Sequence, residues 1–359
     1  MDAFRSSATQ LLQGLRYVPV SDQYSICNIR SSLTNDKDTK VEDLTLNDVE
    51  LRNLVDASST STSTSARPSP EIIDGSTKVV HISYHIDQGL KAAPSVFQHL
   101  WNTFSLDPYM VYMFSRNVPG YHQLPSSASS QGQAEDGNHD LLTFYLNVQA
   151  HWVMWTYNTT TFSTNAIVLS RDTPRRPDAY PAVHAHLKKY AGSSGHPLLL
   201  TLVFALERIE YVDKVVTEQH RRIGRAEQYT GFSHFYLNRP LAVMDEGAEE
   251  RLTRLSDLSR IASSVLVAMA DMVQHMQCAE SMFEGIEGFE LTAGMDGMKG
   301  LVRRDAEMKY IAKLLLPQLK ERYKYMEYIK QRAENQLTVV SIHDTFSPFP
   351  VHPLLILSL

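Results

Sequence analysis

The stretch that decides the fold is residues 301–341, which read LVRRDAEMKYIAKLLLPQLKERYKYMEYIKQRAENQLTVVS. Glycine is absent from it, and Pro317 is its one residue that disfavours a helix. The stretch therefore predicts a single helix of roughly 40 residues, against a mean of about 11–12 residues for helices in globular proteins. A helix of this length must pack along other helices or lead into another part of a structure.

This predicted helix carries a heptad pattern of steps of four and three residues, which is typical of helices that pack along their length. We call the ten positions of this pattern the heptad seam: Met308, Ala312, Leu315, Leu319, Arg322, Met326, Ile329, Ala333, Gln336 and Val340. The polar residues among them, Arg322 and Gln336, predict packing that is partly hydrated or adjustable.

The same helix is basic although the whole chain is acidic. Between Lys299 and Glu334 there are ten Lys and Arg residues and five Asp and Glu residues, which gives +5 within a chain of net charge −6. The interspersed acids and the acidic chain argue against a nucleic-acid partner. A membrane surface is the better match, because anionic lipid attracts neighbouring Lys and Arg by about 1 kcal/mol each.

Upstream of this helix the chain divides into parts of different texture. Residues 1–76, with a Ser/Thr-rich stretch at 57–66, predict a disordered leader and linker that holds at most a short helix from Asn47. Residues 77–195 alternate like strands at 141–148, 151–157 and 163–169 and predict a small α+β domain. Residues 196–341 predict a long-helix domain that ends in the helix 301–341, and residues 342–359 predict an irregular tail. The fold class expected is α+β, mostly helical overall.

The bulk properties exclude several classes of protein. A hydrophobic content of 43% and a charged content of 21% are ordinary for a soluble globular chain. Apolar runs reach about ten residues, against about 20 for a helix that crosses a membrane. Cys27 and Cys278 lie far apart and indicate no disulfide framework. The sequence holds no Ser elbow, no Cys/His signature and no dinucleotide fingerprint, so we expect no enzyme and a cytoplasmic location.

Candidate metal ligands are few. Glu280, Glu284 and Glu287 recur at helical spacing, and carboxylates are the ligands that a hard cation such as Mg²⁺ prefers. A solvated helix face explains the same pattern, and both interpretations stay open. The histidine pairs His81/His85 and His184/His186 are weaker candidates, because neither has a Cys or an acid nearby at ligand spacing.

Several stretches in this order resemble the cytoplasmic part of the CorA-like magnesium transporters, in the divergent form found in filamentous fungi. The stretches that carry the likeness are residues 97–109, 144–146, 152–157, 196–200, 303–312 and 324–340. The resemblance covers about residues 78–341. It implies an α+β domain on a long stalk helix, a pentameric homo-oligomer and Mg²⁺ bound between cytoplasmic domains as a regulatory ion.

In that family the stalk helix continues into a first membrane span that ends in Gly-Met-Asn. No such span or signature follows Ser341, and Gly294-Met295-Asp296 is only a near-spelling in a loop. We therefore expect a truncated cytoplasmic domain of a divalent-cation transporter that does not transport alone and that assembles with itself or with full-length members. It would be a membrane protein if the full-length gene encodes the missing spans. The alternative is a soluble coiled-coil interaction or scaffold protein derived from the same family.

Overall fold

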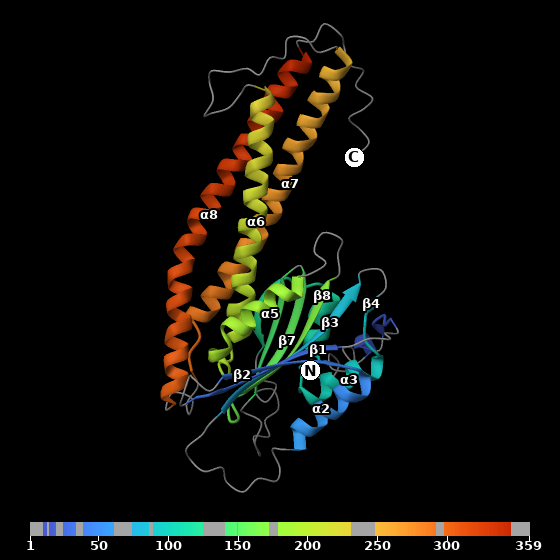
Figure 1. The fold of residues 1–359 in the computed structure, drawn as a ribbon, viewed down its shortest axis with the longest axis vertical. Helices are drawn as coiled ribbons and strands as arrows, with labels where there is room; N and C mark the ends of the chain where they lie inside the picture. The colour runs from blue at the N-terminus through green and yellow to red at the C-terminus, as the bar shows by residue number, and fades with distance from the viewer. Residues whose placement is uncertain are drawn as a thin grey trace. The chain divides into compact units, whose positions relative to one another are not determined.

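The structure is a computed structural model of the 359-residue chain. It describes residues 10–12, 14–18, 24–33, 39–60, 74–85, 89–124, 141–148, 150–171, 179–230, 248–291 and 298–345. The chain forms two compact units, and most of their elements are labelled in Figure 1. The sheet unit comprises Met1–Glu207 and Cys278–Leu315, and the helical unit comprises Arg208–Gln277 and Leu316–Leu359.

The sheet unit is built on an eight-stranded mixed sheet of order β2-β1-β3-β8-β7-β6-β5, with β4 paired to β3 beside this path. Only the β3–β8 pair is parallel among the described strands. The strands are β1 (Tyr24–Ser32), β2 (Thr39–Leu46), β3 (Asp74–His85), β4 (Gly89–Leu90), β5 (Gly120–Leu124), β6 (Leu141–Val148), β7 (His151–Asn158) and β8 (Ser163–Arg171).

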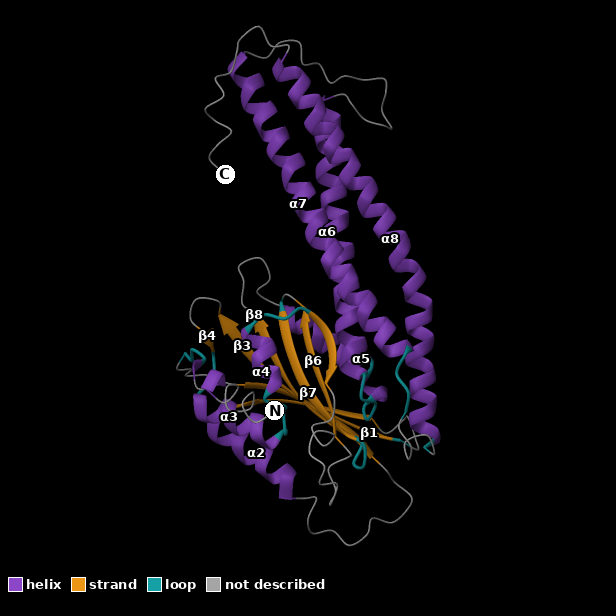
Figure 2. Ribbon diagram, turned by 180° about the vertical axis from the view of Figure 1, so that it is seen from behind, coloured by secondary structure: helices purple, strands orange, loops and turns teal. Residues whose placement is uncertain are grey.

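Both faces of the central strands are covered. Nearly every residue of β7 is buried, as expected for a strand packed on both sides. One face of β7 presents Trp152 and Met154 to a core shared with α2 (Asp48–Thr60), α3 (Pro94–Thr103) and α4 (Tyr109–Ser115). Figure 2 shows α2 and α3 together on one side of the sheet.

The opposite face of β7 packs on the segment that leads into α6 (Leu199–Thr230). Trp155 donates from Nε1 to the Pro197 carbonyl at 3.1 Å, and the Tyr157 hydroxyl donates to the Gly195 carbonyl at 2.8 Å. Before that segment come the helix α5 (Ala179–Lys189) and a short 3₁₀ turn, η2 (Ala191–Ser193). Both aromatic side chains are thus buried with their polar atoms satisfied, which fixes how the sheet meets the first long helix.

Three long helices follow: α6, α7 (Ala248–Glu287) and α8 (Lys299–Thr345), the last of 47 residues. In the helical unit they run side by side (Figures 1 and 2). The predicted single long helix is confirmed, and the heptad seam is its inward side: seven of the ten seam positions are buried, namely Met308, Ala312, Leu319, Met326, Ile329, Ala333 and Gln336. The described helices include none that is both long and apolar enough to cross a membrane.

The fold class, α+β, is as predicted, but the leader was predicted wrongly. Residues 24–32 and 39–46 are not disordered: they form β1 and β2 of the main sheet, and Ile26, Cys27 and Ile29 of β1 are buried. The error has a physical source, because β2 is an edge strand whose residues are mostly exposed and polar. The short helix expected from Asn47 is present as α2, and residues 61–73 lie outside the described residues.

The boundaries of the long-helix region also differ from the prediction. The two units divide the helices internally, so the start of α6 and the start of α8 belong with the sheet. Residues 342–345, predicted as irregular tail, continue α8, and residues 346–359 lie outside the described part of the chain. The predicted turn at 294–300 falls largely on residues 292–297, which are also outside it.

Candidate metal-binding sites

The predicted carboxylate ligands lie near the end of α7. Glu280 is half-buried, while Glu284 and Glu287 are exposed, each one helical turn from the next. Among the described residues these three carboxylates do not form a group within 4.8 Å of one another. Their role as Mg²⁺ ligands stays a prediction, and a cation held there would be bound partly through its own water molecules.

A different set of ligand atoms does converge. Cys27 on β1, Asp43 on β2 and His184 on α5 bring a thiol, a carboxylate and an imidazole within 4.8 Å of one another. Cys27 and Asp43 are directly opposite in the antiparallel β1–β2 ladder, so their side chains project from the same face. We call these three residues the Cys27 cluster.

Asp43 is the centre of the Cys27 cluster. His184 approaches it through Nε2, which lies 2.6 Å from Oδ1, and Lys188 holds the other oxygen, Oδ2, at 2.6 Å from Nζ. Burial acts to raise the pKa of Asp43, but the hydrogen bonds from Lys188 and His184 outweigh it and lower that pKa. Asp43 is therefore an ionised carboxylate shared by two cationic or polar donors.

Cys27 is held as a thiol. Burial raises the pKa of Cys27 to about 12, and the charge of Asp43 and a hydrogen bond to it act in the same direction. Thiolate is the reactive form of cysteine, so a buried thiol with a raised pKa is a poor nucleophile. The cluster therefore does not have the electrostatics of a cysteine hydrolase.

Sequence reasoning missed this cluster because its members are distant in the chain. Asp43 and His184 are 141 positions apart, and Cys27 and Asp43 lie in the segment predicted to be disordered. The His184/His186 pair was noted, but the two side chains diverge on α5, where His186 is buried. Even if β1 and β2 had been predicted as strands, placing Cys27 opposite Asp43 would also have required the register of the β1–β2 pair.

A second polar group joins the start of α8 to the segment that leads into α6. His196 accepts the Leu198 N–H at Nδ1 (3.1 Å), so its proton is on Nε2, which lies 3.3 Å from Oδ1 of Asp305. Burial lowers the pKa of His196 and outweighs the opposing effect of Asp305, so the ring is neutral. Lys309 holds the other oxygen of Asp305 at 2.8 Å. These largely buried hydrogen bonds and ion pairs have a structural role: they hold the start of α8 against the segment before α6.

Arg304 reinforces that junction. It donates to the carbonyl of Ser194 in the turn before α6 and to the carbonyl of Ser32 at the end of β1, the latter at 2.8 Å. Its guanidinium is buried, and burial lowers the pKa of Arg304. The beginning of α8 is thus tied to β1 and to the start of α6 within one unit.

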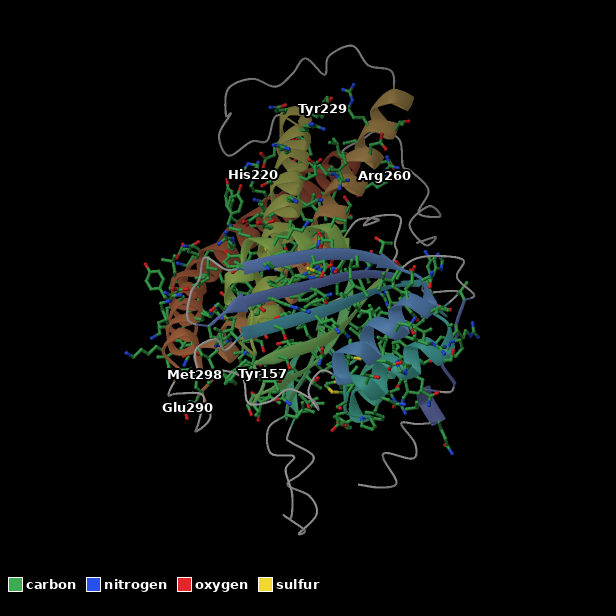
Figure 3. All side chains as sticks on the ribbon, turned by 60° about the horizontal axis from the view of Figure 1, so that its bottom comes forward. Tyr157, His220, Tyr229, Arg260, Glu290 and Met298 are labelled. Carbon is green, nitrogen blue, oxygen red and sulfur yellow. The ribbon has the colours of Figure 1, made fainter. Side chains whose placement is uncertain are left out.

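The helical unit has its own polar layer. Arg332 of α8 makes a two-pronged pair with Glu227 of α6, at 2.7 Å from Nε to Oε1 and 2.6 Å from the terminal nitrogen to Oε2. His220 of α6, labelled in Figure 3, lies 3.2 Å from Arg332 and also hydrogen-bonds Tyr325. A Cβ at position 224 would lie 3.7 Å from a terminal nitrogen of Arg332, which is an ordinary van der Waals contact.

Compared with known proteins, the chain matches no protein-family model and none of the curated proteins.

Proposed function

We propose that the chain is the ion-sensing domain of a divalent-cation transport system that resembles the CorA-like magnesium transporters. It would have no enzymatic activity, would reside on the cytoplasmic side, and would act by associating with copies of itself or with full-length members of such a system. Any membrane-crossing part would lie outside the described residues.

One observation carries the proposal. Two of the stretches on which the resemblance rests, residues 196–200 and 303–312, come together in the sheet unit through His196 and Asp305. This junction joins a mixed sheet to the start of a 47-residue basic helix, which is the order of parts that the resemblance implies. Two of the six stretches that carry the likeness therefore meet where the predicted stalk begins.

The ion would act at the exposed end of α7. Glu284 and Glu287 are exposed and Glu280 is half-buried, so hydrated Mg²⁺ has access to all three carboxylates. Like charges on one helix face repel, and a bound dication relieves that repulsion. We propose that this relief, together with carboxylates supplied by a second copy, couples Mg²⁺ concentration to assembly.

Thermal unfolding in a Mg²⁺ titration tests the proposal. A ligand that binds only the folded state at ten times its dissociation constant stabilises it by about 1.4 kcal/mol, so the midpoint should rise by a few degrees. Replacing all three acids, as E280Q/E284Q/E287Q, should abolish the rise. The matched control is E321Q/E327Q, which removes exposed acids of α8 that pair with Lys324 and Lys330. An unchanged midpoint in the wild-type chain would remove the sensing role.

A second candidate, a helical interaction module, is favoured by a different observation. Since the heptad seam is largely buried within the chain itself, a partner helix must use another side of α8. Tyr310 and Leu314, one turn apart, are exposed there. The double variant Y310S/L314S should weaken association whether the chain is an ion-sensing domain or an interaction module. Only for an interaction module do we expect association that does not depend on Mg²⁺.

A further inference from the structure

We propose that Cys27, Asp43 and His184 bind a zinc-type transition metal, with a fourth position open to water. This site is separate from the carboxylates of α7 and does not depend on the proposed function.

The donor set selects the class of metal. A thiolate, an imidazole and a carboxylate are together the ligands of Zn²⁺, whereas Mg²⁺ and Ca²⁺ take oxygen ligands almost alone. Three protein ligands with a free fourth position is the composition of an open zinc site. The Cys27 cluster would therefore discriminate between the two classes of cation within a single chain.

The geometry requires only small movements. Zinc bonds of about 2.0–2.3 Å in a tetrahedron place ligand atoms about 3.5 Å apart, and the three ligand atoms here already lie within 4.8 Å of one another. The backbone under two of them is fixed by the eight paired positions of the β1–β2 ladder. Asp43 and His184 are partly exposed, which gives an ion a path from solvent.

An independent observation points to the same place. The Tyr180 side chain is buried, and its hydroxyl has no hydrogen-bond partner among the described residues. Burial, followed by Cys27 and Asp43, raises the pKa of Tyr180, so its hydroxyl lies in the field of the cluster. A buried hydroxyl without a partner costs about 1–3 kcal/mol. A water molecule on the open metal position would accept a hydrogen bond from this hydroxyl.

The Tyr180 ring also holds the site in place. It stacks on His81 of β3, with ring centres 3.8 Å apart, and on His184, with ring centres 6.0 Å apart. The metal-binding imidazole is thus supported by a ring that is itself sandwiched against the sheet. Outer contacts of this kind orient a ligand before the metal arrives.

Binding releases one proton. The Cys27 thiol would lose its proton to solvent on binding the metal, and His184 would offer Nε2, the nitrogen that now lies beside Asp43. Because the thiol must lose a proton, the apparent affinity should rise as the pH rises. Lys188 competes for Asp43, since its ammonium group occupies the second carboxylate oxygen.

The test is titration of the purified chain with Zn²⁺, and with Co²⁺ as a spectroscopic substitute. Co²⁺ should produce the thiolate-to-cobalt absorption band, and C27S should lose it while C278S keeps it. H184Q and D43N should each weaken Zn²⁺ binding by about 10- to 100-fold. K188M should tighten binding, because it removes the competing cation.

The matched control is a second histidine–aspartate pair. His99 Nε2 lies 2.9 Å from Asp56 Oδ1, with side chains 30% and 58% exposed, close to the 26% and 43% of His184 and Asp43. Among the described residues, the His99–Asp56 pair has no cysteine beside it as a third ligand. The variants H99Q and D56N should therefore leave zinc affinity unchanged.

Two outcomes would overturn the site: equal zinc affinity in wild type and H184Q, or a cobalt spectrum without the thiolate band. Because His184 and Lys188 are partly exposed, H184Q and K188M remain informative even if C27S fails to fold. A loss of zinc binding with an intact Mg²⁺ response would separate this site from the proposed function.

Discussion

The two units of the molecule place their buried polar groups in different ways. In the sheet unit two large buried side chains, Trp155 and Tyr157, donate hydrogen bonds to the backbone carbonyls of Pro197 and Gly195. In the helical unit a charged pair, Arg332 with Glu227, lies inside the packing between α6 and α8. A sheet fixes its register through its ladder of hydrogen bonds, whereas two helices can slide, and we infer that the buried pair sets their register.

Within the helical unit, a second pair makes the comparison sharper. Arg322 and Asp213 also join α8 to α6 with two hydrogen bonds, of 2.8 and 2.9 Å. Their side chains are 26% and 49% exposed, against 6% and 5% for Arg332 and Glu227. The geometry is alike and the solvent exposure is not, so substitutions in the two pairs should separate the effect of burial from that of hydrogen bonding.

The largest effect should come from the buried pair. R332M leaves the Glu227 carboxylate buried without a partner, which costs about 3–5 kcal/mol. Unfolding by denaturant, followed by the helical signal in circular dichroism, measures this loss. The double variant R332M/E227M removes both charges and should recover most of it. A loss below about 1 kcal/mol in R332M would show that the pair is hydrated and would weaken the contrast between the units.

The next effect lies in the sheet unit, where Gly300 begins α8 against the end of β1. A Cβ at position 300 would lie 1.7 Å from the Leu33 carbonyl oxygen. The variant G300A can therefore fold only if the backbone at Leu33 and the backbone at position 300 move apart. Overpacking of this kind costs about 1–3 kcal/mol. The control is G192A, because a side chain there meets no atom within 4 Å. Equal unfolding midpoints for the two variants would contradict the close contact of α8 with β1.

The stability of the sheet unit should depend on pH through His196. Burial lowers the pKa of this ring, so the folded state stays neutral while the unfolded chain takes up a proton below about pH 6.5. The unfolded state then binds more protons, and stability falls as pH falls, by at most about 1.4 kcal/mol per unit. The charged groups that act on the ring are Asp305, Lys309 and Arg304. Unfolding curves between pH 7.5 and 5.5 should show the slope, and H196Q should flatten it.

The smallest effect should be that of R322M. An exposed pair contributes about 0–1 kcal/mol even with good geometry, because solvent screens both charges. The same denaturant assay used for R332M applies, and salt should reduce the difference further. A loss as large as that of R332M would mean that hydrogen-bond geometry, and not burial, decides the strength of both pairs.

The parts of the fold that were predicted from sequence are those with a local signal. The strands β6, β7 and β8 agree with the predicted ranges to within two residues, because alternation of side chains is visible in each strand alone. The heptad seam was also visible, since every position lies within one helix. Arg322 was expected to dilute the seam, and it sits at a half-exposed contact with Asp213.

The parts that could not be predicted depend on pairing across the chain. β1 and β2 are as long as β6, β7 and β8 but contain more polar residues, so only their ladders identify them. The Cys27 cluster follows from the register of that ladder, which no local pattern specifies. Arg332 lies beside the seam, and its partner Glu227 is 105 positions away. Non-local contacts of this kind decide chemistry without leaving a mark in the sequence.

The most direct test of the central claim, that this chain senses divalent cations, is sedimentation velocity of the wild-type chain and of E280Q/E284Q/E287Q with and without 10 mM Mg²⁺ at constant ionic strength. The account predicts that Mg²⁺ raises the mass of the wild type to a multiple of the 40.6 kDa chain and leaves the triple variant unchanged. Identical mass distributions with and without Mg²⁺ in the wild type would contradict it.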